Sequence, residues 1–373
     1  MSKVPTVRQI IQNIEEIAPK ALAMPGDPVG LQCGEPDRTV RRLMVSLDAT
    51  LETVTQAAEY KADLLVTHHP LFFEPLTRED MLGSPGKTLA RAIRENLTVY
   101  SAHTNLDAAA HGINASFAKL LDLRDGKVLQ TGGPGSFKVV VFVPGEKLGQ
   151  VRSAAFKAGA GQIGDYSGCS FAVEGVGTFH PEVGASPTTG RIQHDEKVQE
   201  VRLEVSVRSD FLGAVLTAVR KAHPYEEPAV DVYALTSSAS GTGFGIAGTL
   251  PRRSTVGQVA ARVASNLKTN SLRLVGKKGG RIKNVAVCAG SGASLLSAAV
   301  AAGAQLYITG DVKYHDARKA EGAGIHVLDV GHFAPERYGI LRFGSLLERK
   351  LTAQGLNVQF SYAKERDPFM PLF

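Results

Sequence analysis

The sequence predicts an α/β protein in which two similar α/β lobes form one split domain, with an α+β domain inserted between them. Two observations lead to this prediction. A strand–helix–strand pattern occurs once in each half of the 373-residue chain, and the segment between the halves has a different order of strands and helices. We therefore expect one lobe at residues 1–125, the inserted domain at 126–239 and the second lobe at 240–373.

The two lobes are recognised by a pseudo-repeat. After an amphipathic helix (VRQIIQNIEEIAPKAL), the segment 43–70 begins with an apolar β-branched run, continues with a helix-period stretch and ends with a second apolar run closed by Thr67. The segment 285–312 repeats this pattern and closes at Thr309. Such spacing is typical of two parallel strands joined by a helix.

Each lobe then adds a further helix and strand. The strand in LTVYSAHTNLD follows the helix KTLARAIREN, and the strand in GIHVLDVGHFAPE follows the helix HDARKAEGA. The polar residues of both lobes therefore lie just past the carboxyl ends of apolar strands. Open α/β sheets place their ligand crevices there.

The inserted segment has the order β-α-β-β-α-β, which predicts a ferredoxin-like sandwich. Its strands are FKVVVFVP, SFAVEGVGTFHP, EVRLEVSVR and AVDVYAL, and its helices are EKLGQVRSAAFKAG and FLGAVLTAVRKAH. The segments 131–136 and 237–245 are rich in Gly and Ser, as linkers are. We expect a domain placed inside another domain.

Composition excludes several classes of protein. The hydrophobic fraction is 43%, and no apolar stretch is long and clean enough to span a bilayer. The charged N-terminal helix does not resemble a secretory leader, so we expect a cytosolic protein without a membrane partner. Cys33, Cys169 and Cys288 are scattered, which argues against a disulfide framework or a thiolate zinc site. The net charge of +6 is dispersed and permits, without demonstrating, nucleic-acid or phosphate binding.

The residues most indicative of chemistry are His68 and His69, which end an apolar strand before Pro70. In a regular strand the two rings would point to opposite sides, so they can converge only because the chain leaves the sheet here. The pair is either a metal ligand pair or a hydrogen-bonded loop pair.

Two further clusters favour the metal. His332 and Glu336 lie four apart, where a helical turn brings side chains together, and Pro335 suits a first helical turn. His103 and Asp107 have the same spacing. Imidazole and carboxylate ligands suit a divalent ion such as Zn, Fe or Mn. The alternative is that these are polar loop residues that never meet.

Four motifs together resemble the Nif-three-like family, whose members are often labelled GTP cyclohydrolase I type 2 homologues. They are THHPLFF, SAHTNLDAAAHGIN, TGDVKYHDA and DVGHFAPE, and GDPVGLQCG, CAGSGASLL and the insert also look like segments of the longer bacterial members. The resemblance covers nearly the whole chain. It implies two metal ions between similar lobes, in subunits that assemble into a toroidal homohexamer.

Carried over by motif, the resemblance implies a ligand set of five residues, with His68 and His69 on different ions, Asp107 on one, His332 on the other, and Glu336 bridging. His103 is expected to orient Asp107 or a bound water. Phe333 stands where the family often has another residue, but it is not a ligand.

Three other features carry open alternatives. Gly290-Ser291-Gly292 follows a strand, and it is either an anion-binding turn or a plain βα turn. Asp311 and His315 are candidate acid–base groups at the position equivalent to His68-His69, although His315 could equally be a surface helix residue. The segment 223–228 is either a capped turn or a loop covering the metal site.

Two functions follow from these expectations. The first is a metal-dependent hydrolase in which a water held by two ions attacks a nucleotide or phosphoester-type substrate, with His103, Asp311 and His315 as candidate catalytic residues. The second is a non-catalytic metal-binding hexamer with a regulatory insert. Open coordination positions favour the first function, because structural sites are usually filled by protein ligands.

Overall fold

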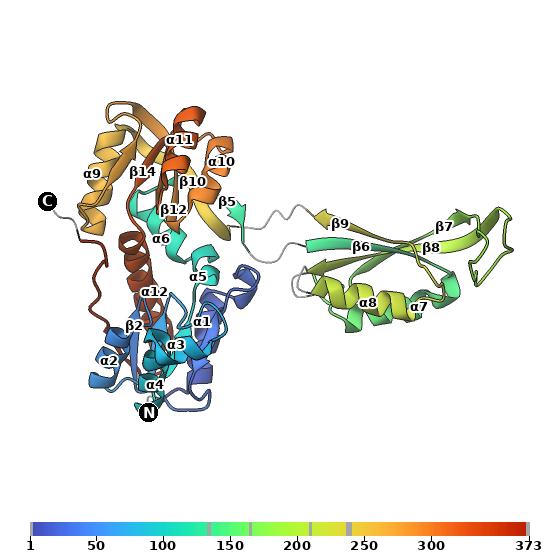
Figure 1. Cartoon of the computed structure of the whole chain (residues 1–373), viewed down its shortest axis with the longest axis horizontal. Helices are drawn as coiled ribbons and strands as arrows, with labels where there is room; N and C mark the ends of the chain where they lie inside the picture. Colours follow the sequence, from blue (N-terminus) through green and yellow to red (C-terminus); the bar gives the residue numbers. More distant parts are fainter. Residues whose placement is uncertain (1–2, 133–135, 164–165, 209–210, 236–240, 371–373) are drawn as a thin grey trace. The chain divides into compact units, whose positions relative to one another are not determined.

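The computed structural model describes residues 3–132, 136–163, 166–208, 211–235 and 241–370. The chain divides into two compact units, one combining residues 1–133 and 239–373 and the other holding 134–238 (Figure 1). The predicted linkers at 131–136 and 237–245 fall partly outside the described residues. No helix within the described ranges is both long and apolar enough to cross a bilayer.

The first unit contains a five-stranded sheet of order β1-β4-β3-β2-β15, in which β15, β2, β3 and β4 are parallel. Its strands are β1 (Gly30–Cys33), β2 (Arg42–Ser46), β3 (Leu64–Thr67), β4 (Thr98–Ser101) and β15 (Gln359–Tyr362). The helices between them are α2 (Leu51–Glu59), α3 (Arg78–Leu82) and α4 (Ser84–Arg94). The parallel β2-α2-β3 arrangement is the strand–helix–strand unit expected from the pseudo-repeat.

The second sheet of this unit has six strands in the order β11-β14-β13-β12-β10-β5, with β12, β13 and β14 parallel. Its strands are β5 (Arg124–Thr131), β10 (Gly243–Thr255), β11 (Arg273–Val275), β12 (Arg281–Ser291), β13 (Leu306–Gly310) and β14 (His326–Asp329). The accompanying helices are α9 (Val256–Leu267), η4 (Ala293–Leu295), α10 (Leu296–Ala301) and α11 (Tyr314–Ala323).

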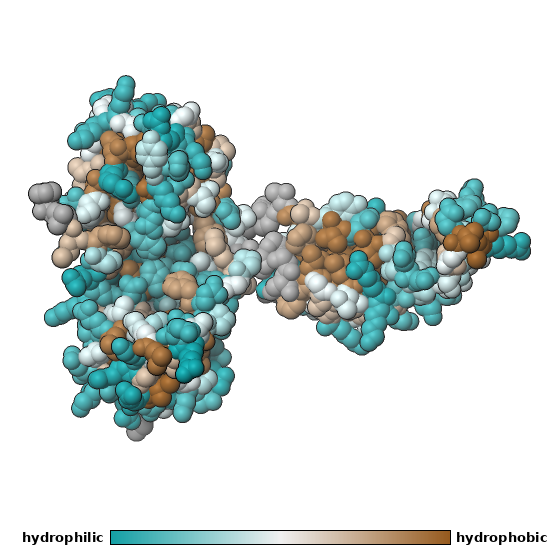
Figure 2. All heavy atoms as spheres, in the orientation of Figure 1, coloured by the Kyte–Doolittle hydropathy of each residue, from teal (hydrophilic) through white to brown (hydrophobic). Residues whose placement is uncertain are grey.

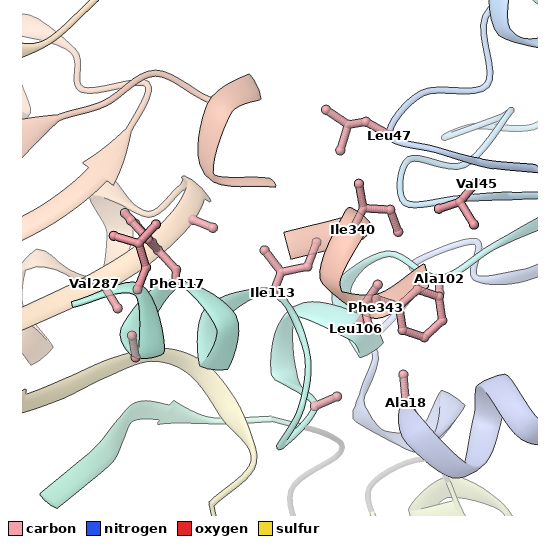
Figure 3. Packing of buried hydrophobic residues seen from close by; sticks show 14 of the residues in the cluster. Ala18, Val45, Leu47, Ala102, Leu106, Ile113, Phe117, Val287, Ile340 and Phe343 are labelled. Carbon is pink, nitrogen blue, oxygen red and sulfur yellow. The ribbon is translucent and has the colours of Figure 1, made fainter. Parts of the chain in front are cut away.

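Helix α12 (Phe333–Ala353) packs between the two sheets and joins them into one core (Figure 3). It contacts β2, β12 and the helix α6 (Ile113–Leu120). Ile340 and Phe343 of α12 are buried with Ile113 and Phe117 of α6. The other helices here are α1 (Val7–Ile17), η1 (Lys20–Leu22) and α5 (Thr104–Ala108). A shared, close-packed core fixes the two sheets relative to each other, so residues at their facing ends are held firmly.

The second unit is a four-stranded antiparallel sheet of order β7-β8-β6-β9 with two helices. Its elements are β6 (Ser136–Val143), η2 (Gly145–Lys147), α7 (Leu148–Lys157), β7 (Ser170–Phe179), β8 (Glu196–Arg208), α8 (Leu212–Ala222) and β9 (Val230–Leu235). Alternate residues of β6 and β8 such as Val139 and Leu203 are fully buried with Val151 and Val215 of the helices. An area of hydrophobic residues is nevertheless visible on the surface of this unit (Figure 2).

Two strands, β5 and β15, lie in a different sheet from the one that the boundaries predicted from the sequence would give them. Residues 124–131, partly assigned to the insert, form β5 and pair with β10 in the six-stranded sheet. Strand β15, near the end of the second lobe's sequence, pairs with β2 in the other sheet. Each of the two sheets thus receives an edge strand from a distant part of the chain. Strand pairing of this kind leaves no periodicity signal in the sequence, because an edge strand reads alike beside either sheet.

Candidate metal centre

The adjacent residues His68 and His69 converge because β3 ends at Thr67. Both backbone N–H groups donate to the carbonyl of Leu47, at 3.1 and 2.9 Å, which draws the chain away from the sheet. The Thr67 hydroxyl donates to the His69 carbonyl at 2.7 Å and tightens the turn. The two ring centroids lie 4.9 Å apart, with His68 fully buried.

The remaining ligand candidates lie at the starts of two helices. His103 directly precedes the short helix α5, which carries Asp107. His332 directly precedes α12, and Glu336 lies in its first turn. Gly290 is required opposite Glu336: its φ is +64°, and an added Cβ would lie 2.0 Å from Glu336 Oε1. A glycine at the end of β12 therefore makes room for a buried carboxylate.

These side chains form two groups that share Glu336. In the first, the ligand atoms of His69, His332 and Glu336 lie within 4.8 Å of one another; His69 Nε2 is 3.1 Å and His332 Nε2 is 2.9 Å from Glu336 Oε2. In the second, His68 Nε2 lies 3.6 Å from Asp107 Oδ1 and 3.9 Å from Glu336 Oε1. The five predicted ligands thus meet, with one carboxylate between two groups.

Each of the four histidines has its Nδ1 bonded to an oxygen on the side away from the centre. His68 Nδ1 meets the Ala102 carbonyl at 2.9 Å. Three carboxylates serve the other rings at 2.7, 2.8 and 2.7 Å: Asp48 for His69, Asp27 for His103, and Asp311 for His332. A ring that donates from Nδ1 keeps the Nε2 lone pair for a metal, and such partners fix both tautomer and orientation.

Two polar atoms at the centre, His68 Nε2 and Asp107 Oδ1, are buried without a hydrogen-bond partner among the described residues. Uncompensated buried groups of this kind are costly, and they point to a bonding partner at the centre. Imidazole nitrogens and carboxylate oxygens facing one spot fit a divalent cation. The residues present therefore suit the metal ions that the sequence implied.

Burial and neighbouring charges shift the pKa values of the side chains at the centre. Desolvation lowers the pKa of His68 to about 3, and desolvation with the nearby Glu336 raises the pKa of Asp107 well above its ordinary value. Burial disfavours protonated His69, but hydrogen bonds to Asp48 and Glu336 outweigh it and raise its pKa to about 10. The hydrogen bond to Glu336 raises the pKa of His332 to about 9. Despite burial, the pKa of Glu336 is lowered by His332 and His69. Without metal, protons on His69 and His332 thus compensate the buried carboxylate.

A cavity of about 710 Å³ opens beside the first ligand group. Asp48, His69, Asp311 and His332 lie along one part of its wall. The rest of the wall comes from the loop before β11, from Phe333 and from the C-terminal segment 367–369. A cavity of this size beside the first ligand group accommodates a small molecule.

The three candidate catalytic residues, His103, Asp311 and His315, occupy three different kinds of position in the structure. His103 lies among the ligands, but its ring bonds Asp27 rather than Asp107. Asp311 orients His332, and its contact is therefore with a ligand histidine. His315 is exposed on α11, where its ring contacts Tyr314, and it belongs to neither ligand group. Of the two sequence interpretations of His315, the surface position agrees with the structure.

The Gly290–Gly292 turn resolves in favour of the plain βα turn. The Gly292 N–H donates to Thr309 Oγ1 at 3.0 Å, so it is already used within the protein. In the second unit, His223 closes a local turn: its Nε2 meets the Phe142 carbonyl at 2.9 Å, and its Nδ1 accepts the Tyr225 N–H at 3.1 Å. These bonds agree with a capped turn.

Sequence reasoning missed Asp27 and Asp48, the carboxylates that orient His103 and His69. Asp48 comes two residues after β2, so the rule that polar residues past strand ends gather at one sheet edge would have found it. Asp27 lies in a loop before β1 and is 76 residues from its partner. Only its place in the segment GDPVGLQCG could have drawn attention to it.

Comparisons with known proteins agree over the whole chain. A family model described as Duf34/NIF3 (NGG1p interacting factor 3) matches residues 5–368. A Bacillus subtilis protein named GTP cyclohydrolase 1 type 2 homolog is 38% identical over 376 residues, which is 99% of each chain. A Mycobacterium tuberculosis protein of the same name is 38% identical over 332 residues, or 88% of this chain and 87% of its own.

Solved structures show the same likeness. A Bacillus cereus protein related to NIF3 aligns with a TM-score of 0.69 and 38% identity, over all of both chains. A Staphylococcus aureus protein aligns with a TM-score of 0.71 and 26% identity, over 99% of both. The mixed α/β fold with several sheets is therefore one that crystal structures of related proteins share.

Proposed function

Because the chain belongs to the Duf34/NIF3 family, we propose that it is a metal-dependent hydrolase holding two divalent ions and acting on a nucleotide or phosphoester-type substrate. His68 and Asp107 would hold one ion, His69 and His332 the other, with Glu336 bridging. The ions would be Zn, Fe or Mn, which imidazole and carboxylate ligands suit. Two such ions would supply an activated water and would polarise a substrate oxygen.

The protein's own residues perform the rest of the chemistry. The orienting carboxylates Asp48 and Asp311 accept from Nδ1 of His69 and His332 and would keep the Nε2 atom of each ring directed at an ion. His103, kept in one orientation by Asp27, is the group best placed to exchange a proton beside the ions. Burial of Glu336 and His68 excludes bulk water from one side of the centre.

One observation carries the proposal. Each histidine of the cluster has its Nδ1 hydrogen-bonded to an oxygen on the outer side, so that its Nε2 faces the centre. A merely structural histidine cluster does not need four separate oxygen partners on the outer side. The five ligands over two ions would also leave coordination positions open on the side of the cavity, as catalytic sites require.

The relatives' names support the substrate class only indirectly. GTP cyclohydrolase 1 type 2 homolog is what the similar proteins are called. An alternative is a non-catalytic metal-binding protein, with the unit at 134–238 in a regulatory role. We further propose a homohexamer in the cytoplasm, and a ferredoxin-like identity for the inserted unit, which its strand order β7-β8-β6-β9 supports.

The test compares metal-stripped protein with protein reloaded with Zn²⁺, Fe²⁺ or Mn²⁺, assayed against nucleotides and phosphoesters. We expect two bound ions per chain, turnover only after reloading, and loss of turnover in Glu336→Gln. Arg318→Gln, a change on exposed α11, is the matched control and should behave as wild type. Equal turnover by stripped and reloaded protein would refute the hydrolase. Two bound ions without turnover of any substrate would favour the non-catalytic alternative.

A further inference from the structure

The cavity beside the metal centre has acidic walls, and its carboxylates are paired with donors of the protein. Four aspartates line it, and each accepts a hydrogen bond from the protein. The donors are His69 for Asp48, His332 for Asp311, Arg273 with two backbone N–H groups for Asp329, and the Phe369 N–H for Asp367. These bonds use part of the acceptor capacity of each carboxylate, and the guanidinium of Arg273 offsets the charge of Asp329.

The same cavity also presents hydrogen-bond donors that the described part of the protein does not use. Arg273 begins β11 and uses one terminal nitrogen, NH2, for both Asp329 and the Val312 carbonyl. Its Nε and NH1 have no hydrogen-bond partner among the described residues, and its side chain is 72% exposed. The neighbouring side chains of Asn270 and Ser271 are exposed and likewise unbonded within the described ranges. A guanidinium held on one side by a carboxylate still presents donors for an oxyanion.

An apolar wall lies in the same cavity. Leu47, Leu272 and Phe333 contribute partly or fully buried surface, while Pro368 and Phe369 come from the C-terminal segment. Phe369 is 82% exposed although it is a large aromatic residue. An aromatic ring with this exposure gains most when a flat apolar group covers it.

We propose that Arg273 and Phe369 form a substrate-recognition subsite of the metal centre, for a ligand that joins an oxyanion to a planar ring, as a nucleotide does. Arg273 binds the oxyanion with its free donors, and Phe369 stacks on the ring. The proposal rests on the proposed function, because it places this ligand at the same centre. Substrate selection would then lie in residues outside the ligand motifs.

The test measures binding to the metal-loaded full chain by calorimetry. The probes are adenosine, inorganic phosphate and an AMP phosphonate, in which a methylene group replaces the ester oxygen and so prevents hydrolysis. If ring and anion are both recognised, the phosphonate should bind at least about tenfold more tightly than either fragment. Arg273→Gln should weaken phosphonate binding by about tenfold and leave adenosine binding unchanged.

Further variants separate the two contacts. Arg273→Lys keeps the charge but loses the planar fork, so it should restore part of the affinity only. Phe369→Ala should lower the affinity for the phosphonate and for adenosine by similar factors, and it should leave the affinity for phosphate unchanged. Metal content should stay at the wild-type value in all three variants, and Arg318→Gln serves as the control for loss of a surface charge.

Two outcomes overturn the subsite. Unchanged phosphonate affinity in Arg273→Gln would mean that the anion binds the ions alone, and phosphonate affinity no greater than that of phosphate would mean that no ring is recognised. These results are independent of turnover. Arg273-dependent binding without hydrolysis would uphold the subsite and refute the hydrolase, whereas hydrolysis unaffected by Arg273→Gln would do the reverse.

Discussion

Replacing Asp48 with Asn tests whether the orienting carboxylates matter for metal binding. Asp48 Oδ1 accepts the Nδ1–H of His69 at 2.7 Å, and its side chain is 40% exposed. Asn can occupy the same space and still accept a hydrogen bond, but it carries no charge. The change should therefore leave the fold intact and reduce the basicity of His69 Nε2.

The expected magnitude follows from that exposure. Loss of an orienting partner costs about 10- to 100-fold in metal affinity. A partly exposed carboxylate is screened by water, so we expect about tenfold, or about 1.4 kcal/mol. His69 belongs to the group with His332, so the affinity for the ion in that group should fall. The affinity for the ion held by His68 and Asp107 should not change.

The assay is a competition titration of metal-stripped protein against a chromophoric chelator, which resolves two affinities. Asp311→Asn is the matched variant, because Asp311 orients His332 in the same ligand group and is similarly exposed, at 43%. Both variants should weaken the same ion. If Asp48→Asn binds both ions with wild-type affinity, the assignment of His69 to one ion is wrong. The same conclusion follows if the affinities for both ions fall equally.

Two further predictions concern protons and the C-terminal segment. Metal-free protein keeps His69 and His332 protonated up to their raised pKa values of about 10 and 9, so their ion pairs stabilise the fold fully below pH 6.5 and are lost as pH rises through 9 to 10. Metal binding at pH 7.5 should accordingly release about two protons, as calorimetry in buffers of different ionisation enthalpy would measure; zero release would contradict it. Glu365 is buried, accepts the backbone N–H groups of Leu47 and Asp48 and pairs with Arg337 at 3.3 Å. Glu365→Gln should lower the unfolding free energy by about 3 kcal/mol in urea titrations. It should also lower the affinity for the ion bound by His69. An unchanged unfolding free energy would exclude this role.

The candidate ligand residues could be picked out from the sequence because their signal is local. His68 and His69 end a buried strand, and His332 and Glu336 are one helical turn apart, so each short segment identifies its own residues. Parallel strands then bring His68 and His69 to one end of the five-stranded sheet and His332 to the facing end of the six-stranded sheet. The lobes' strand–helix–strand units follow from periodicity in the same way.

The partners of those ligands could not be predicted, because they are set by tertiary structure. Asp27 reaches His103 from a loop 76 residues earlier in the chain, and Asp311 reaches His332 across 21 residues. Asp311 was singled out for a catalytic role, since sequence position indicates that a residue lies near a site but not which atom it contacts. Gly290, whose missing Cβ admits Glu336, is likewise evident only in three dimensions.

These missing partners change the electrostatic argument about substrates. Counting Asp107 and Glu336 alone against two divalent ions suggests a cationic site that attracts any phosphate. Asp27, Asp48 and Asp311 add three carboxylates beside His103, His69 and His332, so that five carboxylates face the four positive charges of two divalent ions. Long-range attraction is then weak, and an oxyanion must be selected by direct contacts. That requirement gives the unused donors of Arg273 their importance, because the proposed subsite would let a guanidinium outside the ligand set select the anion that enters.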